Sequence, residues 1–120
     1  KVLFEHPGSD ARLLYFDRFC DKTVIDRVQE LKVVSADDSS SASSKGIHVI
    51  REPPIIVFGK KRNHRRNVGF FSDACFGYPY SGMVMHAQPL PDWMSDLQVQ
   101  VNALLGTSFN GILVNHYEDG

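Results

Sequence analysis

The stretch IIVFGKKR, residues 55–62, joins an apolar run to a run of cations through a single glycine. The β-branched and aromatic residues 55–58 predict a strand, and Gly59 predicts the tip of a turn. Pro53 and Pro54 separate this strand from a second one over 47–50. Further strands are predicted over 13–16, 68–71 and 109–117, the last of them buried, and helices over 21–31 and from Pro91 to just before Gly106. The pattern predicts an α+β fold that is mostly β.

Composition limits the class of protein. The 120 residues carry a formal net charge of −1, which excludes a strongly basic, histone-like binder but leaves room for a local basic patch. No window approaches 18 consecutive apolar residues, so we predict no membrane partner. The two cysteines, Cys20 and Cys75, form no C-x-x-C motif, and an intracellular location is expected.

Positive charge is concentrated directly after the predicted turn. Residues 60–66 hold five of the 13 basic residues: Lys60, Lys61, Arg62, Arg65 and Arg66. One interpretation is a wedge, in which Val57 and Phe58 enter stacked bases while the cations hold phosphates. The other is a buried strand end followed by a solvated charged loop.

Aromatic residues gather in a second stretch, FGYPYSG over residues 76–82, which we predict to be turn-rich. Tyr78 and Tyr80 lie two positions apart, and such an aromatic face can stack on a base. The alternative is packing of loop aromatics on the core.

The end of the last predicted strand carries polar residues. In a strand, Asn115 and Tyr117 point to one side while His116 and Glu118 point to the other. His116-x-Glu118 is a weak match to part of an iron site. We predict instead that Asn115 and Tyr117 are buried polar groups, for which a ligand carboxylate would supply acceptors.

Three stretches together resemble the AlkB-like iron(II)/2-oxoglutarate dioxygenases, and among them the type that repairs double-stranded DNA. VFGK over 57–60 is similar to the finger hairpin that wedges into the duplex. YPYSG over 78–82 is similar to the nucleotide-recognition lid. SFN and LVNHYEDG, over 108–110 and 113–120, resemble the Phe-Asn … Asn-x-Tyr-x-Asp-Gly strand.

The resemblance implies the N-terminal part of a double-stranded β-helix, or jelly roll, with a nucleotide-recognition lid. It implies that Asn115 and Tyr117 bind 2-oxoglutarate. It also implies a set of residues that contact nucleic acid or the target base: Val57, Phe58, Gly59, Lys60, Lys61, Arg62, Arg66, Tyr78, Tyr80 and Ser81. The function implied is DNA alkylation repair by oxidative demethylation of N-alkylated bases, with iron and 2-oxoglutarate in the full-length protein.

The family's iron-binding H-x-D follows the Asp-Gly, so we expect the metal ligands beyond Gly120 and expect this chain alone to be inactive, with no catalytic residue of its own and no strongly bound cofactor. We expect one incomplete domain over 1–120, with a helix and flexible Ser-rich loop over about 10–50, finger and lid over about 51–88, and a helix and first core strand over about 89–120. The expected partner is duplex DNA with a flipped alkylated base, bound by a monomer, in the nucleus if the source is eukaryotic. The alternatives are a non-catalytic nucleic-acid-binding module or an AlkB-like demethylase acting on RNA.

Overall fold

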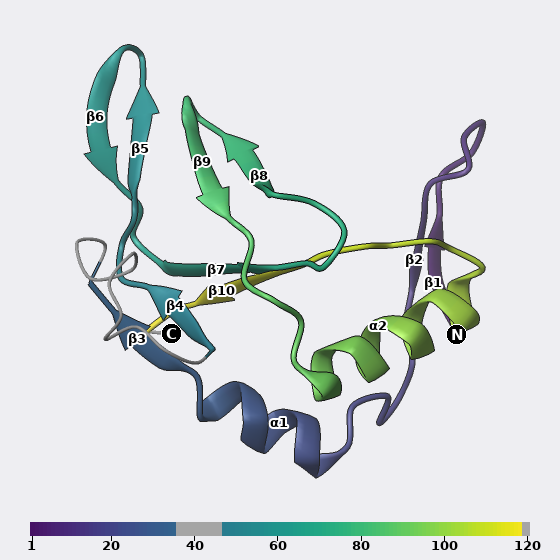
Figure 1. Ribbon diagram of the computed structural model, residues 1–120. Coiled ribbons are helices and arrows are strands. Elements are labelled where there is room, and N and C mark those ends of the chain that lie inside the picture. The colour runs from purple at the N-terminus through teal and green to yellow at the C-terminus, as the bar shows by residue number, and fades with distance from the viewer. Residues whose placement is uncertain (36–46, 119–120) are drawn as a thin grey trace. The chain divides into compact units, whose positions relative to one another are not determined.

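The computed structural model describes residues 1–35 and 47–118. The predicted Ser-rich loop and the final Asp-Gly pair lie outside the described residues. Contacts divide the chain into two compact units, Lys1–Glu30 and Leu31–Gly120, and each is considered by itself (Figure 1). The single domain expected over 1–120 therefore stays a prediction.

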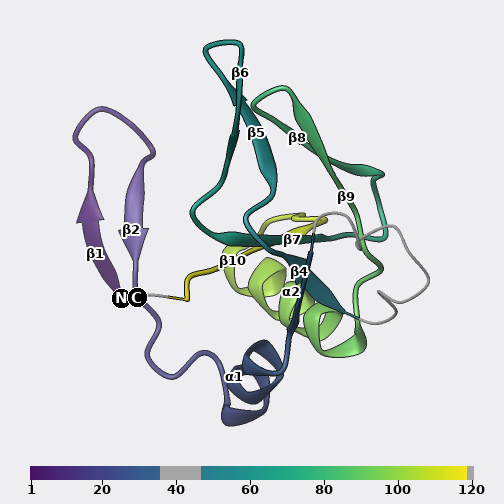
Figure 2. The same ribbon diagram turned by 90° about the vertical axis from the view of Figure 1, so that its left-hand side faces the viewer.

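The first unit contains a hairpin and one helix. Strands β1 (Val2–Glu5) and β2 (Arg12–Leu14) pair antiparallel, and helix α1 spans Lys22–Gln29 (Figure 2). The helix begins as predicted, because the Asp21 side chain accepts a hydrogen bond from the Val24 N–H and so satisfies a free donor of the first turn. The strand predicted over 13–16 is confirmed only in part, since β2 ends at Leu14.

The second unit is built on a four-stranded sheet with the order β10-β7-β4-β3. Its strands are β3 (Lys32–Val34), β4 (His48–Ile50), β7 (Asn67–Phe71) and β10 (Ile112–His116). Strands β3 and β4 run parallel, and the other pairs are antiparallel. The sheet therefore has β7 and β4 inside and β10 at one edge.

The core lies around β7, in which all five residues are buried. Val68 and Phe70 form an apolar cluster with Met85, while Phe71 is fully buried. Gly69 has little space for a side chain, because a Cβ atom there would lie 3.0 Å from the carbonyl oxygen of His48. The run without polar side chains over residues 68–71 of β7 thus agrees with burial on both faces.

Two hairpins rise from the same side of β7, as Figures 1 and 2 show. One joins β5 (Pro54–Val57) to β6 (Lys60–Asn63), and the other joins β8 (Gly77–Tyr80) to β9 (Met83–His86). The first confirms the hairpin predicted around Gly59. The second corrects the turn-rich loop expected over 76–82, because cross-strand pairing organises these residues into a ladder with its turn at Ser81 and Gly82.

Helix α2 (Asp92–Leu105) lies on the other side of β7 from the hairpins (Figures 1 and 2). Pro91 is its N-cap rather than its first helical residue, and Gly106 ends it in the left-handed conformation, as predicted, at φ 65°. Met94 is the buried residue of this helix. Among the described residues, neither helix is long and apolar enough to cross a membrane.

The prediction of a buried strand over 109–117 is wrong in extent and in burial. Strand β10 covers Ile112–His116, and it is an edge strand that pairs with β7 alone. Within the described residues, no strand pairs with its outer edge. As a result Asn115 is exposed and Tyr117 is 58% exposed, although both were expected to be buried.

Candidate functional site

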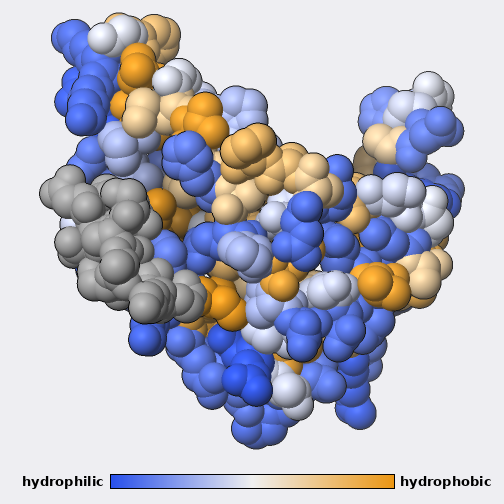
Figure 3. All heavy atoms as spheres, viewed as in Figure 1, coloured by the Kyte–Doolittle hydropathy of each residue, from blue (hydrophilic) through white to orange (hydrophobic). Residues whose placement is uncertain are grey.

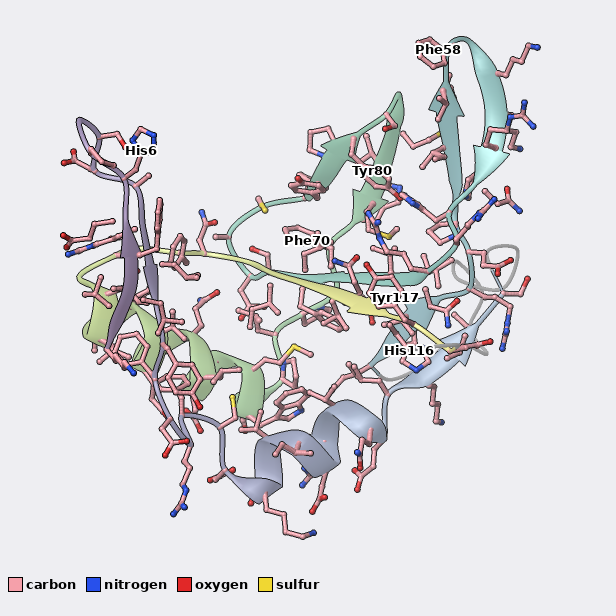
Figure 4. The ribbon with its side chains drawn as sticks, turned by 180° about the vertical axis from the view of Figure 1, so that it is seen from behind. His6, Phe58, Phe70, Tyr80, His116 and Tyr117 are labelled. Atoms are coloured by element: carbon pink, nitrogen blue, oxygen red, sulfur yellow. The ribbon has the colours of Figure 1, made fainter. Side chains whose placement is uncertain are left out.

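The tip of the β5–β6 hairpin presents one aromatic side chain to solvent. Val57 and Lys60 pair across the turn, and the two residues between them have positive φ, 49° at Phe58 and 72° at Gly59. Two positive φ values in a two-residue loop are typical of a type I′ turn. Phe58 is 100% exposed (Figure 4), and a left-handed phenylalanine costs about 1–2 kcal/mol, so neither burial nor backbone preference explains it.

Cations line the strand that leads away from this tip. Lys60, Lys61 and Arg62 lie on β6 and are exposed, as is Arg65, while Arg66 is half-buried. Among the residues that the structure describes, none of these five cations forms an ion pair with a carboxylate. In Figure 3 hydrophilic residues at the outer edge of this hairpin adjoin hydrophobic ones. The cations are therefore free to meet the anionic groups of a partner.

The predicted aromatic pair belongs to a longer aromatic row, which consists of His64, Tyr80, Tyr78 and Phe70. The ring centroids are 5.1 Å apart for His64 and Tyr80, 6.0 Å for Tyr80 and Tyr78, and 5.8 Å for Tyr78 and Phe70. Figure 4 shows Tyr80 and Phe70 between the hairpins and the sheet. Centroid distances of this size are typical of favourable contacts between aromatic rings. Tyr78 remains 43% exposed and offers part of its ring to a ligand.

The pKa values of the two residues at the His64–Tyr80 end of the aromatic row are shifted. Burial, and secondly the charge of Arg66, lower the pKa of His64. Burial raises the pKa of the Tyr80 phenol, against an opposing effect of Arg66. Tyr80 therefore keeps its proton, and the ring of His64 favours its neutral form. Nε2 of His64 and Nε of Arg66 are buried without a hydrogen-bond partner in the described chain.

The two hairpins are linked by their backbones. The Ile56 N–H donates a hydrogen bond of 2.9 Å to the carbonyl oxygen of Ser81. Ser81 and Gly82 form the turn of the β8–β9 hairpin, with φ values of 43° and 73°. The exposed tip at Phe58 and the aromatic row are thus carried on connected elements.

A cavity of about 390 Å³ lies beneath the hairpins. Its walls come from β4, β5, β9 and Tyr80, and they include Ile50, Pro53, Met83 and Met85. Gln88 closes one side by a two-point contact with the backbone of His48, accepting from its N–H at 3.1 Å and donating to its carbonyl oxygen at 2.8 Å. The sequence carries no signal for this cavity, since its walls come from separate strands.

The register of the sheet determines which way the end of β10 faces. Asn115 lies opposite Val68, and Leu113 opposite Phe70, so these side chains share one face of the sheet. Phe70 is in contact with Tyr78 on that face. Asn115 therefore points to the side of the sheet that carries the aromatic row. Neither Asn115 nor the Tyr117 hydroxyl has a side-chain hydrogen bond within residues 1–35 and 47–118.

On the opposite face, Asn67 forms a network that sequence reasoning missed. Its Nδ2 lies 2.9 Å from Nδ1 of His116 and donates to Glu118 Oε1 at 3.1 Å. Glu118 also accepts from Nη1 of Arg51, at 3.0 Å and 3.3 Å. The sequence feature that could have revealed the network is Asn67 itself, a polar residue at the start of an otherwise apolar strand.

A smaller cavity of about 160 Å³ adjoins this network. It brings together Arg66 and Tyr117, for which the resemblance implies DNA contact and 2-oxoglutarate binding (Figure 4 labels Tyr117 and His116). The other lining residues are Glu52, Arg65, Asn67, His116 and Glu118. A residue predicted to contact DNA and a residue predicted to bind 2-oxoglutarate thus line the same cavity.

No group of three or more His, Cys, Asp or Glu side chains in the described part of the chain could hold a metal ion. The polar groups suited to an organic acid are different, because the exposed Asn115 amide and Tyr117 hydroxyl can both donate. These two donors suit the carboxylates of 2-oxoglutarate, and their role in binding it stays a prediction. The prediction of iron ligands beyond Gly120 stays a prediction.

Comparison with known proteins finds the DNA oxidative demethylase ALKBH2 of three mammals. A 64-residue stretch, 53% of this chain, is 31% identical to the human protein, 33% to the mouse protein and 30% to the bovine protein. It covers 24%, 27% and 23% of those proteins, so the chain spans about a quarter of their length. No protein-family model matches the chain. The similarity supports the resemblance to AlkB-like proteins.

Proposed function

We propose that this chain is the substrate-recognition part of an enzyme that repairs alkylated DNA by oxidative demethylation. The observation that carries the proposal is the strained, fully exposed Phe58 at a hairpin tip, beside cations that have no carboxylate partner in the described chain. Strain at a non-glycine residue is retained where a function requires it. An aromatic side chain that wedges between bases must be exposed, whereas one that stabilises the fold has no need of exposure.

In this proposal the β5–β6 hairpin engages the duplex. Phe58, flanked by Val57 and Gly59, enters the space that the target base leaves, and this offsets part of the cost of unstacking. Lys60, Lys61, Arg62 and Arg66 hold backbone phosphates. The sequence-independent part of the affinity comes from these cations.

The β8–β9 hairpin receives the flipped base. Tyr78 offers an exposed ring for stacking, and Tyr80 carries a phenolic proton, which burial favours further by raising its pKa. Ser81 is exposed at the turn and can donate from its hydroxyl. The base would thus meet one stacking surface and two donors.

Asn115 and Tyr117 would hold 2-oxoglutarate at the end of β10, where Asn115 faces the side of the aromatic row and Tyr117 lines the smaller cavity. Iron and 2-oxoglutarate, when bound, supply the oxidation that removes the methyl group. The role of this chain is to orient the co-substrate and the base toward each other. The sheet would be the beginning of a double-stranded β-helix, in a protein that acts as a monomer and, in a eukaryote, in the nucleus.

Fluorescence of a base analogue provides the test. A duplex with 2-aminopurine beside an N-methylated base is titrated with the chain and with its Phe58→Ala variant. Base flipping by the wild type raises the fluorescence, and the variant raises it much less. A matched duplex without the lesion is the control.

The whole protein is then assayed for formaldehyde release from methylated duplex and from methylated RNA. Release from the duplex supports the proposal. Binding without release would instead indicate a non-catalytic nucleic-acid-binding module, and release from RNA alone would move the substrate to RNA.

A further inference from the structure

We infer that Asn67 is a positioning residue that sets the end of β10, and through it the side chains of Asn115 and Tyr117. The inference rests on the proposed function for one step, the binding of 2-oxoglutarate by these two residues. Its structural part stands on the hydrogen bonds of Asn67 alone.

Both polar atoms of the Asn67 side chain form hydrogen bonds. It is 2% exposed and lies directly opposite His116 in the register of β7 and β10. Its Oδ1 accepts from the Glu52 N–H at 3.2 Å, while Nδ2 faces His116 and Glu118 at 2.9 Å and 3.1 Å. A buried amide with all its hydrogen bonds made is a fixed point in the structure.

These contacts also assign the protonation state of His116. The Glu52 N–H can only donate, so the atom that it meets must be the amide oxygen of Asn67. The amide nitrogen therefore faces His116, and Nδ1 must accept. His116 is consequently the neutral tautomer with its proton on Nε2, an assignment made from the network.

The network anchors the chain on both sides of Tyr117. His116 and Glu118 are its two neighbours, and both are bound to Asn67. Arg51 holds Glu118 a second time. Since β10 is an edge strand paired with β7 alone, the residues after it have no further strand to align them in the described chain. Asn67 supplies that alignment from the buried side.

Asn67 also holds the other wall of the smaller cavity. Glu52 has a positive φ of 39°, and its N–H depends on Oδ1 of Asn67. One buried side chain therefore sets the backbone on two sides of the cavity that contains Tyr117 and Arg66. Its loss should displace the binding groups rather than merely lower stability.

The first experiment uses Asn67→Asp in the ¹⁵N-labelled chain. The carboxylate keeps the size of the amide and still accepts from Glu52, but in its ionised form it cannot donate, and it faces Glu118, which the amide nitrogen met at 3.1 Å. The ionised carboxylate needs a donor, so we expect the proton of His116 to move to Nδ1. Nitrogen NMR of the imidazole should show an unprotonated Nδ1 in the wild type and a protonated Nδ1 in the variant. A wild type already protonated at Nδ1 would overturn the inference.

The second experiment measures the 2-oxoglutarate requirement of the whole protein. We expect Asn67→Asp to raise it roughly tenfold, since small displacements of a positioned group have effects of this size or larger. Ser72→Ala is the matched control: Ser72 is buried just beyond the other end of β7, where its hydroxyl donates to the Asn110 carbonyl oxygen. It should lower stability but leave the requirement within about twofold.

The outcomes separate the inference from the proposed function. If Asn115→Ala and Tyr117→Phe raise the 2-oxoglutarate requirement but Asn67→Asp does not, the positioning role is wrong. If Asn115→Ala and Tyr117→Phe have no effect, the proposed ligand role fails and the last step of the inference fails with it. The NMR result still decides the Asn67–His116 hydrogen bond in that case.

Discussion

A Cβ atom placed on Gly82 would lie 3.2 Å from Cδ1 of Ile56, so the turn of the β8–β9 hairpin is pressed against the β5–β6 hairpin. With the Ile56–Ser81 hydrogen bond, this contact joins the element that carries Phe58 to the element that carries Tyr78 and Tyr80. In the proposed function the two hairpins would therefore engage DNA as one unit, without moving relative to each other. The first prediction concerns this contact.

Gly82→Ala should destabilise the chain more than Gly59→Ala. Both glycines have nearly the same φ, 73° and 72°, so both variants carry the cost of a left-handed alanine, about 1–2 kcal/mol. Nothing lies within 4 Å of the Cβ position at Gly59, whereas Gly82→Ala also crowds Ile56. We expect a further loss of about 1 kcal/mol, measured by urea denaturation. Equal losses would show that the hairpins are not tightly joined.

Phe58→Ala should reduce activity on a methylated duplex by about tenfold, while activity on the same lesion in a single strand stays within about twofold. Only the duplex requires a base to leave its stack and its pair. Paired rate measurements on the whole protein, with both substrates, check this difference. An equal loss on the two substrates would show that Phe58 is not a wedge and would remove the argument for duplex DNA.

Neutralising Lys60, Lys61 and Arg62 should weaken DNA binding for all sequences. Each phosphate contact that is lost should lower the magnitude of the slope of log affinity against log salt by about 0.9. Fluorescence anisotropy over a range of salt concentrations measures the slope. Neutralising Arg12, Arg18 and Lys22 in the first unit removes the same charge and should leave the slope nearly unchanged. An unchanged slope in the first variant would place the DNA elsewhere.

His64 should make the chain less stable as the pH falls. Because burial and Arg66 lower the pKa of His64 in the folded state, the unfolded chain takes up the proton first. The stability from this residue is complete above the unfolded value of about 6.5, and it is lost as the pH falls from there toward the folded pKa. Urea denaturation at pH 7.5 and 5.5 should show a smaller pH effect in His64→Gln than in the wild type. An identical pH effect in both proteins would contradict this.

Asn115→Ala and Tyr117→Phe should each raise the 2-oxoglutarate requirement of the whole protein. Each change leaves a charged ligand oxygen without a donor, which costs about 1–3 kcal/mol. Leu113→Ala is a useful control, since Leu113 is also exposed and lies on the same face of β10. Titration of 2-oxoglutarate in the formaldehyde assay measures the effect. A similar change in all three variants would point to a general disturbance of the strand.

Local features of the structure could be predicted from the sequence because short stretches determine them. The glycine between an apolar and a cationic run predicted the hairpin at Phe58, and the side chain of Asp21 predicted the start of α1. Gly106 predicted the end of α2 in the same way. These features depend on backbone preferences and on hydrogen bonds between residues at most four apart. Burial was harder to predict than these local features. Strand β10 was wrongly predicted to be buried, because an apolar sequence does not reveal which other elements of the fold cover it.

The sequence by itself thus determined the hairpin tip, the clustered cations and the residue types at the candidate site. Only the tertiary structure decided which of them meet. It packed His64 against Tyr80, turned Asn115 toward the side of the aromatic row, and bonded Asn67 to His116 and Glu118, 49 and 51 residues away. The physical reason is that such contacts depend on strand register and on burial of the whole sheet, which no local pattern of residues encodes.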